Sequence, residues 1–207
     1  MSVTKKDCMA AALTFDDGPS ADITPRILEL LSQYNASASF CVLGSCAAKY
    51  PEIIKQTADR GFEIVNHSWD HENFTKISDE EIKESILKTE DAIYSACGKH
   101  SAFVRPPYGA FNSRTSEVLR SLGKAQLLWN TDSLDWKTRD FIPIVSEVLA
   151  RERHGKVILL HDIYKPTYEA MLAVVPFFCS RGFRMVTAGE LLRMSGITVI
   201  PGESYCM

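Results

Sequence analysis

The sequence has no long apolar run, no block of basic residues and no apolar leader. Its apolar runs are far shorter than the roughly 20 residues of a membrane-spanning helix, so no membrane span is expected. The net charge is -3 and the basic residues are dispersed, which argues against a nucleic-acid partner. Residues 1–7 are polar and lack the core of a signal peptide, so we expect either a cytoplasmic protein or a mature or excised domain.

Paired cysteine motifs are also missing. Six cysteines are present, but no two are spaced as C-x-x-C, so a structural zinc ribbon is not expected. Most of them have apolar neighbours, and we expect these to be buried free thiols. Cys8 and Cys206 lie near the two chain ends, which often lie close together in space, so they could pair in an oxidising compartment.

Composition and periodicity predict one α/β domain. The 207 residues are 45% hydrophobic and 24% charged, which is enough to bury a sizeable core. Strand patterns alternate with helical spacing about seven times, without a repeat or a low-complexity linker. This alternation predicts a parallel sheet, either a barrel or an open doubly wound sheet. No G-x-G-x-x-G follows the first strand, which argues against a dinucleotide fold.

The expected elements can be given by residue range. The expected strands are residues 9–15, 36–43, 62–65, 102–104, 125–130, 156–160 and 183–186. The expected helices are residues 23–34, 47–60, 78–97, 113–122, 141–154, 168–180 and 188–194. Ser78 and Glu81 form a capping-box pattern at the start of the third helix. Both candidate architectures place their chemistry at the carboxyl ends of the strands.

Two adjacent carboxylates, Asp16 and Asp17, end the first strand just before the chain breaker Gly18-Pro19. In an extended chain the two side chains would point to opposite sides, so one could hold a metal while the other accepts a proton. The alternative is a solvated strand-to-turn junction, because aspartate favours turns.

Two histidines follow the third strand four residues apart. His67 and His71 could face the same way on one helical turn, a spacing used for divalent metals. With a carboxylate from the first strand end they would form a common three-ligand catalytic zinc shell. The alternative is that His67 is a packed core histidine and His71 a surface one.

Three further strand ends carry polar residues. Arg105 follows the fourth strand and could hold a carboxylate by bidentate bonding, unless it is an ordinary surface arginine. Asp132, Asp135 and Trp136 follow the fifth strand, where Trp136 could be a sugar-stacking wall or core packing beside a cap. His161 ends an apolar strand, so its imidazole should be partly desolvated. Chance placement of such residues at five strand ends is improbable.

Five segments in order carry a family resemblance: T-F-D-D-G-P, H-S-W-D-H, R-P-P-Y-G, D-S-L-D-W and L-L-H-D. They resemble the five motifs of the polysaccharide deacetylases, also called family-4 carbohydrate esterases or NodB-homology domains. The resemblance extends from Leu13 to about Leu192, without a departure at a catalytic position. It implies a distorted, incomplete (β/α) barrel, with residues 1–207 forming a single catalytic domain.

The resemblance also implies roles for individual residues. The implied metal ligands are Asp17, His67 and His71. Asp16 would be the general base, oriented by Arg105, and His161 the general acid. Either Asp132 or Asp135 would tune His161. The implied walls of the acetyl and sugar pocket are Pro107, Tyr108, Trp136 and Leu159.

The implied activity is metal-dependent removal of acetyl groups from N-acetylated polysaccharide, such as chitin oligomers or peptidoglycan. The implied metal is Zn2+, with Co2+ or another divalent ion as the alternative. The implied location is extracellular or at the cell surface, and we expect a monomer. Three other functions stay open: an acetylxylan esterase, an inactive sugar-binding relative, and a cytoplasmic metal hydrolase of small amides. The intact set of motifs argues against the inactive relative.

Overall fold

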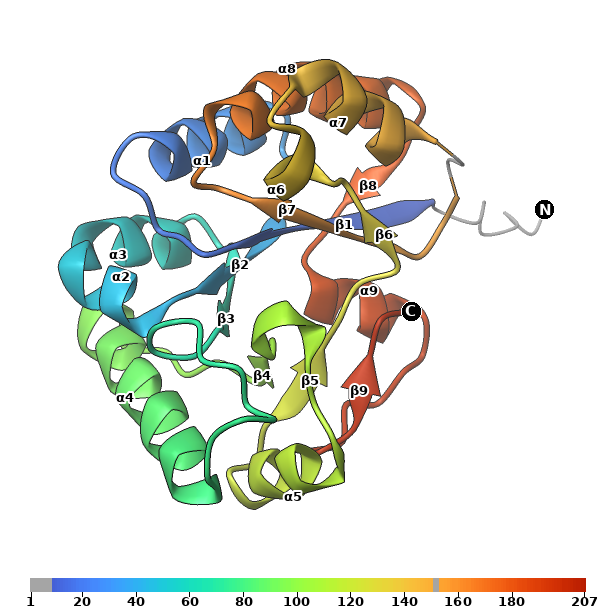
Figure 1. The fold of residues 1–207 in the computed structure, drawn as a ribbon. Helices are drawn as coiled ribbons and strands as arrows, with labels where there is room; N and C mark the ends of the chain where they lie inside the picture. Colours follow the sequence, from blue (N-terminus) through green and yellow to red (C-terminus); the bar gives the residue numbers. More distant parts are fainter. Residues whose placement is uncertain (1–8, 151–152) are drawn as a thin grey trace.

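A curled parallel sheet forms the centre of the computed structural model, which describes residues 9–150 and 153–207 (Figure 1). Within these residues the strand order is β6-β7-β1-β2-β3-β4-β5-β9, and β8 pairs with the start of β1. The strands are β1 (Ala10–Asp16), β2 (Ala38–Val42), β3 (Glu63–Asn66), β4 (Phe103–Val104), β5 (Ala125–Leu127), β6 (Thr131–Asp132), β7 (Lys156–His161), β8 (Arg184–Met185) and β9 (Ser204–Tyr205). The end strands β6 and β9 do not pair with each other in the described structure, so the predicted incomplete barrel is confirmed.

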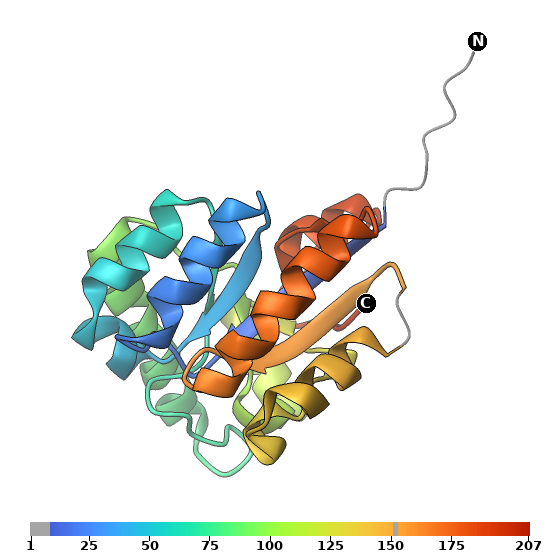
Figure 2. The same cartoon turned by 90° about the horizontal axis from the view of Figure 1, so that it is seen from above.

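Helices surround this sheet. They are α1 (Ile23–Gln33), α2 (Gly44–Lys49), α3 (Pro51–Asp59), α4 (Asp79–Cys97), α5 (Ser113–Ser121), α6 (Asp135–Thr138), α7 (Phe141–Leu149), α8 (Lys165–Ser180) and α9 (Ala188–Met194), with a 3-10 turn η1 at Pro107–Gly109. Helices α1 and α8 lie side by side over one face of the sheet (Figure 2). None of the helices in the described part of the chain combines the length and hydrophobicity that crossing a membrane requires.

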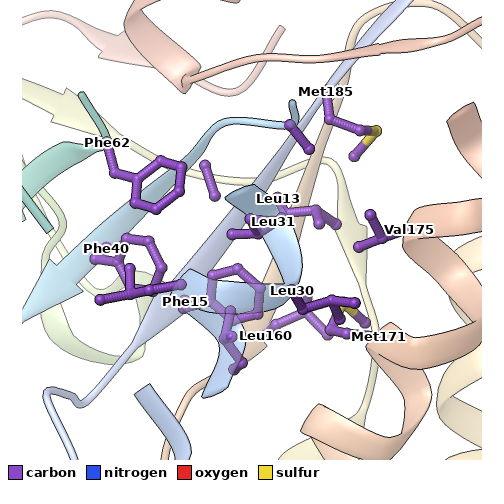
Figure 3. Close-up of a cluster of buried hydrophobic side chains, with 14 of the residues drawn as sticks. Leu13, Phe15, Leu30, Leu31, Phe40, Phe62, Leu160, Met171, Val175 and Met185 are labelled. Atoms are coloured by element: carbon purple, nitrogen blue, oxygen red, sulfur yellow. The ribbon is translucent and has the colours of Figure 1, made fainter. Parts of the chain in front are cut away.

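Strand β1 is buried along its whole length because both of its faces are covered. Its odd-numbered residues Leu13 and Phe15 pack in the core under the outer helices, and Phe15 stacks on Phe40 with ring centroids 5.2 Å apart (Figure 3). Its small residues Ala10 and Ala12 face the other way and pack with residues of α9. Side chains alternate along a strand, so the even-numbered Asp16 at the end of β1 also lies on the inner face of the barrel.

The sequence predicted most elements within a few residues, but it did not predict η1, α6 or β9, and three expected elements differ from the structure. The expected helix 47–60 is two helices, because Pro51 starts a new helix and the residue before a proline avoids helical backbone, as Tyr50 does at φ -130°. The expected strand 125–130 ends at Leu127, and the chain then moves across to pair as β6 with β7. The expected helix 141–154 ends at Leu149 as α7, and residues 151–152 lie outside the described residues. The capping box of Ser78 and Glu81 is confirmed.

The cysteines follow the prediction only in part. Cys41 is a buried free thiol, whereas Cys46, Cys97 and Cys179 are half-buried and Cys206 is exposed. Cys8 lies outside the described residues, so its pairing with Cys206 stays a prediction.

Candidate active site

The carboxyl ends of the strands surround a pocket of about 490 Å³. Its polar walls are Asp16, Asp17, His67, His71, Asp132 and His161. Its apolar and aromatic walls are Tyr108, Trp129, Trp136, Leu159 and Tyr164. The strand ends that carry the sequence motifs therefore meet in one cavity, as both candidate architectures predicted.

Asp17, His67 and His71 form a cluster suited to a cation. Oδ1 of Asp17 lies 3.5 Å from Nε2 of His67 and 3.5 Å from Nε2 of His71. Ligands about 2.1 Å from a tetrahedral zinc ion lie roughly 3.4 Å from one another, so the spacing fits such an ion. Oδ1 of Asp17 is also buried and has no hydrogen-bond partner among the described residues.

The protonation of the two imidazoles suits the same purpose. Nδ1 of His67 lies 2.7 Å from the carbonyl oxygen of Arg105, and a carbonyl can only accept, so this nitrogen donates and Nε2, which faces Asp17, is the nitrogen available to a metal. Burial and the proximity of His67 lower the pKa of His71, which favours its neutral, ligating form. Burial raises the pKa of Asp17, but the neighbouring His67, His161 and His71 together lower it by more, so the carboxylate form prevails. The two Nε2 atoms and the carboxylate of Asp17 therefore lie where they could converge on one cation.

The segment from His67 to His71 is a loop, so the expectation of a shared helical turn was wrong. Ser68 and His71 have left-handed backbone, with φ of 71° and 64°. These two conformations bend the chain back so that the imidazole rings meet edge to face, with centroids 5.0 Å apart. The four-residue spacing identified the pair, but its geometry is that of a strained loop.

The two neighbouring aspartates enter the same pocket, so the expectation of opposite sides was wrong. Asp17 has a φ of 71°, which ends the extended strand and turns its carboxylate into the cavity beside that of Asp16. Their partners nevertheless differ. Oδ1 of Asp16 accepts a 2.7 Å hydrogen bond from Arg105, whereas Oδ1 of Asp17 faces the two histidines.

Arg105 is completely buried beneath the pocket, so the alternative of a surface arginine was wrong. One guanidinium nitrogen, Nη1, donates to Oδ1 of Asp16 and to Oγ1 of Thr14, each at 2.7 Å. Nε donates to the carbonyl of Leu127 and Nη2 to the carbonyl of Leu128. The contact with Asp16 therefore uses a single oxygen rather than the bidentate pair expected, because the other donors hold the backbone after β5.

His161 pairs with Asp135. Its Nδ1 lies 2.7 Å from Oδ1 of Asp135, whose Oδ2 accepts from the backbone N–H of His161 and from Thr167. Burial lowers the pKa of His161, but the hydrogen bond and the charge of Asp135, together with the charges of Asp16 and Asp17, raise it to about 9. Asp132 instead accepts from the backbone N–H of Leu134. Of the two aspartates between which the sequence could not decide, the contact belongs to Asp135.

The aromatic walls are only partly those predicted. Tyr108, Trp136 and Leu159 line the pocket, and Tyr108 is 67% exposed at its mouth, whereas Pro107 is buried and does not line it. Trp129 and Tyr164 were not predicted. Trp129 fell inside an expected strand, and Tyr164 lies just after the L-L-H-D motif rather than in it. An aromatic residue within three positions of a motif is the signal that could have found both.

The chain belongs to the polysaccharide deacetylase family, whose sequence profile matches residues 4–127. It is 38% identical over 180 residues to a peptidoglycan-N-acetylglucosamine deacetylase of Listeria monocytogenes, covering 87% of this chain and 38% of the relative. It is 39% identical over 181 residues to the peptidoglycan-N-acetylmuramic acid deacetylase PdaC of Bacillus subtilis, covering 87% and 38%. The chain thus spans less than half the length of these two relatives.

A solved structure shares the fold over nearly the whole chain. It is a family 4 acetyl xylan esterase from Clostridium thermocellum in complex with a cobalt ion, 31% identical, with a TM-score of 0.88. The match covers 95% of this chain and 97% of that one. The family predicted from the five motifs is confirmed.

Proposed function

We propose that this chain is a metal-dependent deacetylase that hydrolyses the acetamido group of N-acetylated polysaccharide, in peptidoglycan or chitin oligomers. One observation carries the proposal: the cluster of Asp17, His67 and His71 shares a pocket with the side chain of Asp16 and a protonated imidazole, His161. The printed names of the two peptidoglycan deacetylases support the substrate class.

The donor set fits a divalent cation. Two imidazole nitrogens and one carboxylate oxygen are a common shell for catalytic zinc, and cobalt accepts the same ligands. When bound, such an ion would lower the pKa of a water molecule and polarise the acetyl carbonyl as a Lewis acid. We propose zinc as the metal, with cobalt or another divalent ion as the alternative.

Asp16 would take the proton of the attacking water. Its Oδ1 is held by Arg105, so the carboxylate cannot rotate freely, and its Oδ2 points toward the cluster, 3.7 Å from Nε2 of His67. A base fixed in this way meets the requirement that it lie within hydrogen-bond reach of the proton it abstracts. A backbone N–H near Tyr108 would stabilise the negative charge that develops on the acetyl carbonyl oxygen.

His161 would protonate the sugar nitrogen as it leaves. Asp135 accepts the proton of Nδ1, so Nε2 is the nitrogen available to the substrate. With a pKa of about 9 the ring is a cation at neutral pH and carries the proton that an amine needs to depart. Trp136 and Tyr108, both exposed at the mouth of the pocket, would pack against the sugar ring.

The metal triad is tested by removing one ligand at a time. We expect Asp17→Ala, His67→Ala and His71→Ala each to lose stoichiometric metal and with it acetate release. The measurement is metal analysis of protein purified without chelator, followed by acetate detection on chitin oligomers, acetylated peptidoglycan and acetylxylan. Stoichiometric metal in all three variants would refute the triad. Preference for acetylxylan would identify an O-deacetylase, and no acetate from any substrate with metal bound would favour the inactive sugar-binding relative.

The pH profile tests the pairing of His161 with Asp135. We expect Asp135→Asn to lower the pKa of His161 from about 9, because the hydrogen bond and the charge of Asp135 are the largest contributions that oppose burial and favour the charged ring. The ring must be protonated to act as an acid, so the pH above which kcat falls should move to lower pH. The measurement is kcat on an N-acetylglucosamine oligomer between about pH 6 and pH 10.

The matched control for this profile is Asp132→Asn. Asp132 lines the same pocket but bonds to the backbone of Leu134, so its loss should leave the position of the high-pH limb unchanged. The same limb in Asp135→Asn and in the parent would show that another group sets it.

Location and domain extent follow from the same relatives. Because the two relatives named above are peptidoglycan deacetylases, we propose that the chain acts outside the cell or at its surface. We also propose that residues 1–207 form one catalytic domain, which the single continuous sheet of the described residues supports.

A further inference from the structure

The loop that carries both histidines of the cluster has a backbone that needs support. Ser68 and His71 lie at φ of 71° and 64°, a region sparsely populated by residues with a side chain. Such conformations persist where the surroundings over-determine them. The residue directly before the loop, Asn66, is the last of β3 and is completely buried.

Asn66 uses both ends of its side-chain amide to fix this loop. Its Oδ1 accepts a 3.1 Å hydrogen bond from the backbone N–H of Ser68, which closes a turn around His67. Its Nδ2 donates to the carbonyl of Ile86 and to Oε1 of Glu90, each at 3.0 Å, and both residues belong to α4. The amide thus connects the start of the metal-binding loop to the longest helix among the described residues.

Three hydrogen-bond partners determine which way round this amide lies, and Glu90 is one of them. The carbonyl of Ile86 and the side chain of Glu90 accept from the NH2 group, and the backbone N–H of Ser68 can only donate, so the oxygen of Asn66 must face Ser68. Glu90 is only 4% exposed, and its charge is balanced by Lys124, whose Nζ lies 2.7 Å from Oε2. Oε2 also accepts from the backbone N–H of Ser101. A buried and paired carboxylate of this kind has little freedom to reorient.

We infer that Asn66 and Glu90 are positioning residues for the metal site: they hold the 67–71 loop in its left-handed conformation and thereby set the affinity for the cation. This inference rests on the proposed function, because it takes the cluster of Asp17, His67 and His71 to be the metal site. Other contacts hold the later part of the loop, such as the hydrogen bond from Ser45 to the carbonyl of Trp69. Asn66 acts at Ser68, directly beside the first histidine.

The test measures zinc affinity rather than activity. Metal-stripped parent, Asn66→Ala and Glu90→Gln would be titrated with Zn2+ against a competing chromophoric chelator, and the unfolding of each metal-free protein measured. We expect Asn66→Ala to raise the Kd for zinc about 10–100-fold, the range seen when a group that orients a metal ligand is removed. Glu90→Gln should raise it in the same direction but by less, because it weakens the hydrogen bond that Nδ2 of Asn66 makes to Glu90 while the carbonyl of Ile86 still accepts from the same group.

The matched control is Gln126→Ala. Gln126 is also a fully buried amide on a strand, but its Nε2 donates to Ser116 and to the carbonyl of Gly202, away from the loop. It should lose stability while keeping the zinc Kd of the parent. A Kd for Asn66→Ala equal to that of Gln126→Ala would overturn the inference. If Asn66→Ala does not fold, the near-isosteric Glu90→Gln decides in the same way. A parent that binds no zinc would refute the metal site itself, and the inference with it.

Discussion

Asp16→Asn is expected to keep its metal and lose activity by about 10²–10⁴-fold, the cost of removing a general base. Asparagine has the shape of aspartate, and its amide oxygen can still accept the hydrogen bond from Nη1 of Arg105. The NH2 group would then take the place of Oδ2, the oxygen that faces the cluster, and an amide nitrogen cannot accept a proton. The measurement is metal content together with kcat on an N-acetylglucosamine oligomer.

Two outcomes would contradict the assignment of Asp16 as the base and Asp17 as the metal ligand. Near-parental turnover with metal bound would mean that another group takes the proton. Loss of the metal would mean that Asp16 is itself a metal ligand. This is the specific alternative, because Oδ2 of Asp16 lies only 3.7 Å from Nε2 of His67. Asp132→Asn serves as the control for a carboxylate that lines the same pocket without contacting the cluster.

The sequence predicted the fold because its signals are local. Alternating strand and helix patterns indicate a parallel sheet whatever its closure, and the apolar run of β1 follows from burial on both faces. Whether the sheet curls into a barrel depends on strand stagger between distant segments, which no local pattern records. The division of the expected helix 47–60 at Tyr50-Pro51 could have been predicted, because proline is common at the first position of a helix and disrupts a helix interior.

The site was predictable in its residues and less so in its geometry. Adjacent aspartates and paired histidines can be recognised by their chemistry and spacing. The left-handed backbone at Asp17, Ser68 and His71 could not be predicted in this way, because glycine is the residue that indicates such a conformation in a sequence. The choice between Asp132 and Asp135 depends on where a separate strand, β6, ends relative to His161. That is a contact across the sheet.

The supporting residues were the hardest to predict. Glu90 and Lys124 look like ordinary surface charges of a helix and a turn in the sequence, yet their 2.7 Å pair is mostly buried beside the loop of the histidines. The expected partner of Arg105, Asp16, is the one observed, but the complete burial of Arg105 was not predicted. Charged residues become buried only when partners from distant segments arrive, so their burial cannot be inferred from neighbours in sequence.

His161→Ala is expected to reduce hydrolysis of an N-acetylglucosamine oligomer much more than hydrolysis of an aryl acetate. An amine leaves only when it is protonated, and Nε2 of His161, with Nδ1 committed to Asp135, is the proton donor in the pocket. A phenolate of low pKa can depart without that proton. The measurement is kcat/KM of parent and variant on both substrates. It gives one variant-to-parent ratio for the oligomer and one for the aryl acetate.

The comparison has an internal control in Asp16→Asn. Water must attack the acetyl carbon of both substrates, so loss of the base should lower the two ratios by similar factors, whereas loss of His161 should separate them. Because Asp135 would lose its partner in His161→Ala, the metal content and unfolding temperature of the variant should be compared with those of the parent. If a folded, metal-loaded His161→Ala loses activity on both substrates by the same factor, His161 does not protonate the leaving group. Stabilisation of the oxyanion by its cationic ring would then be the better account of its place in the pocket.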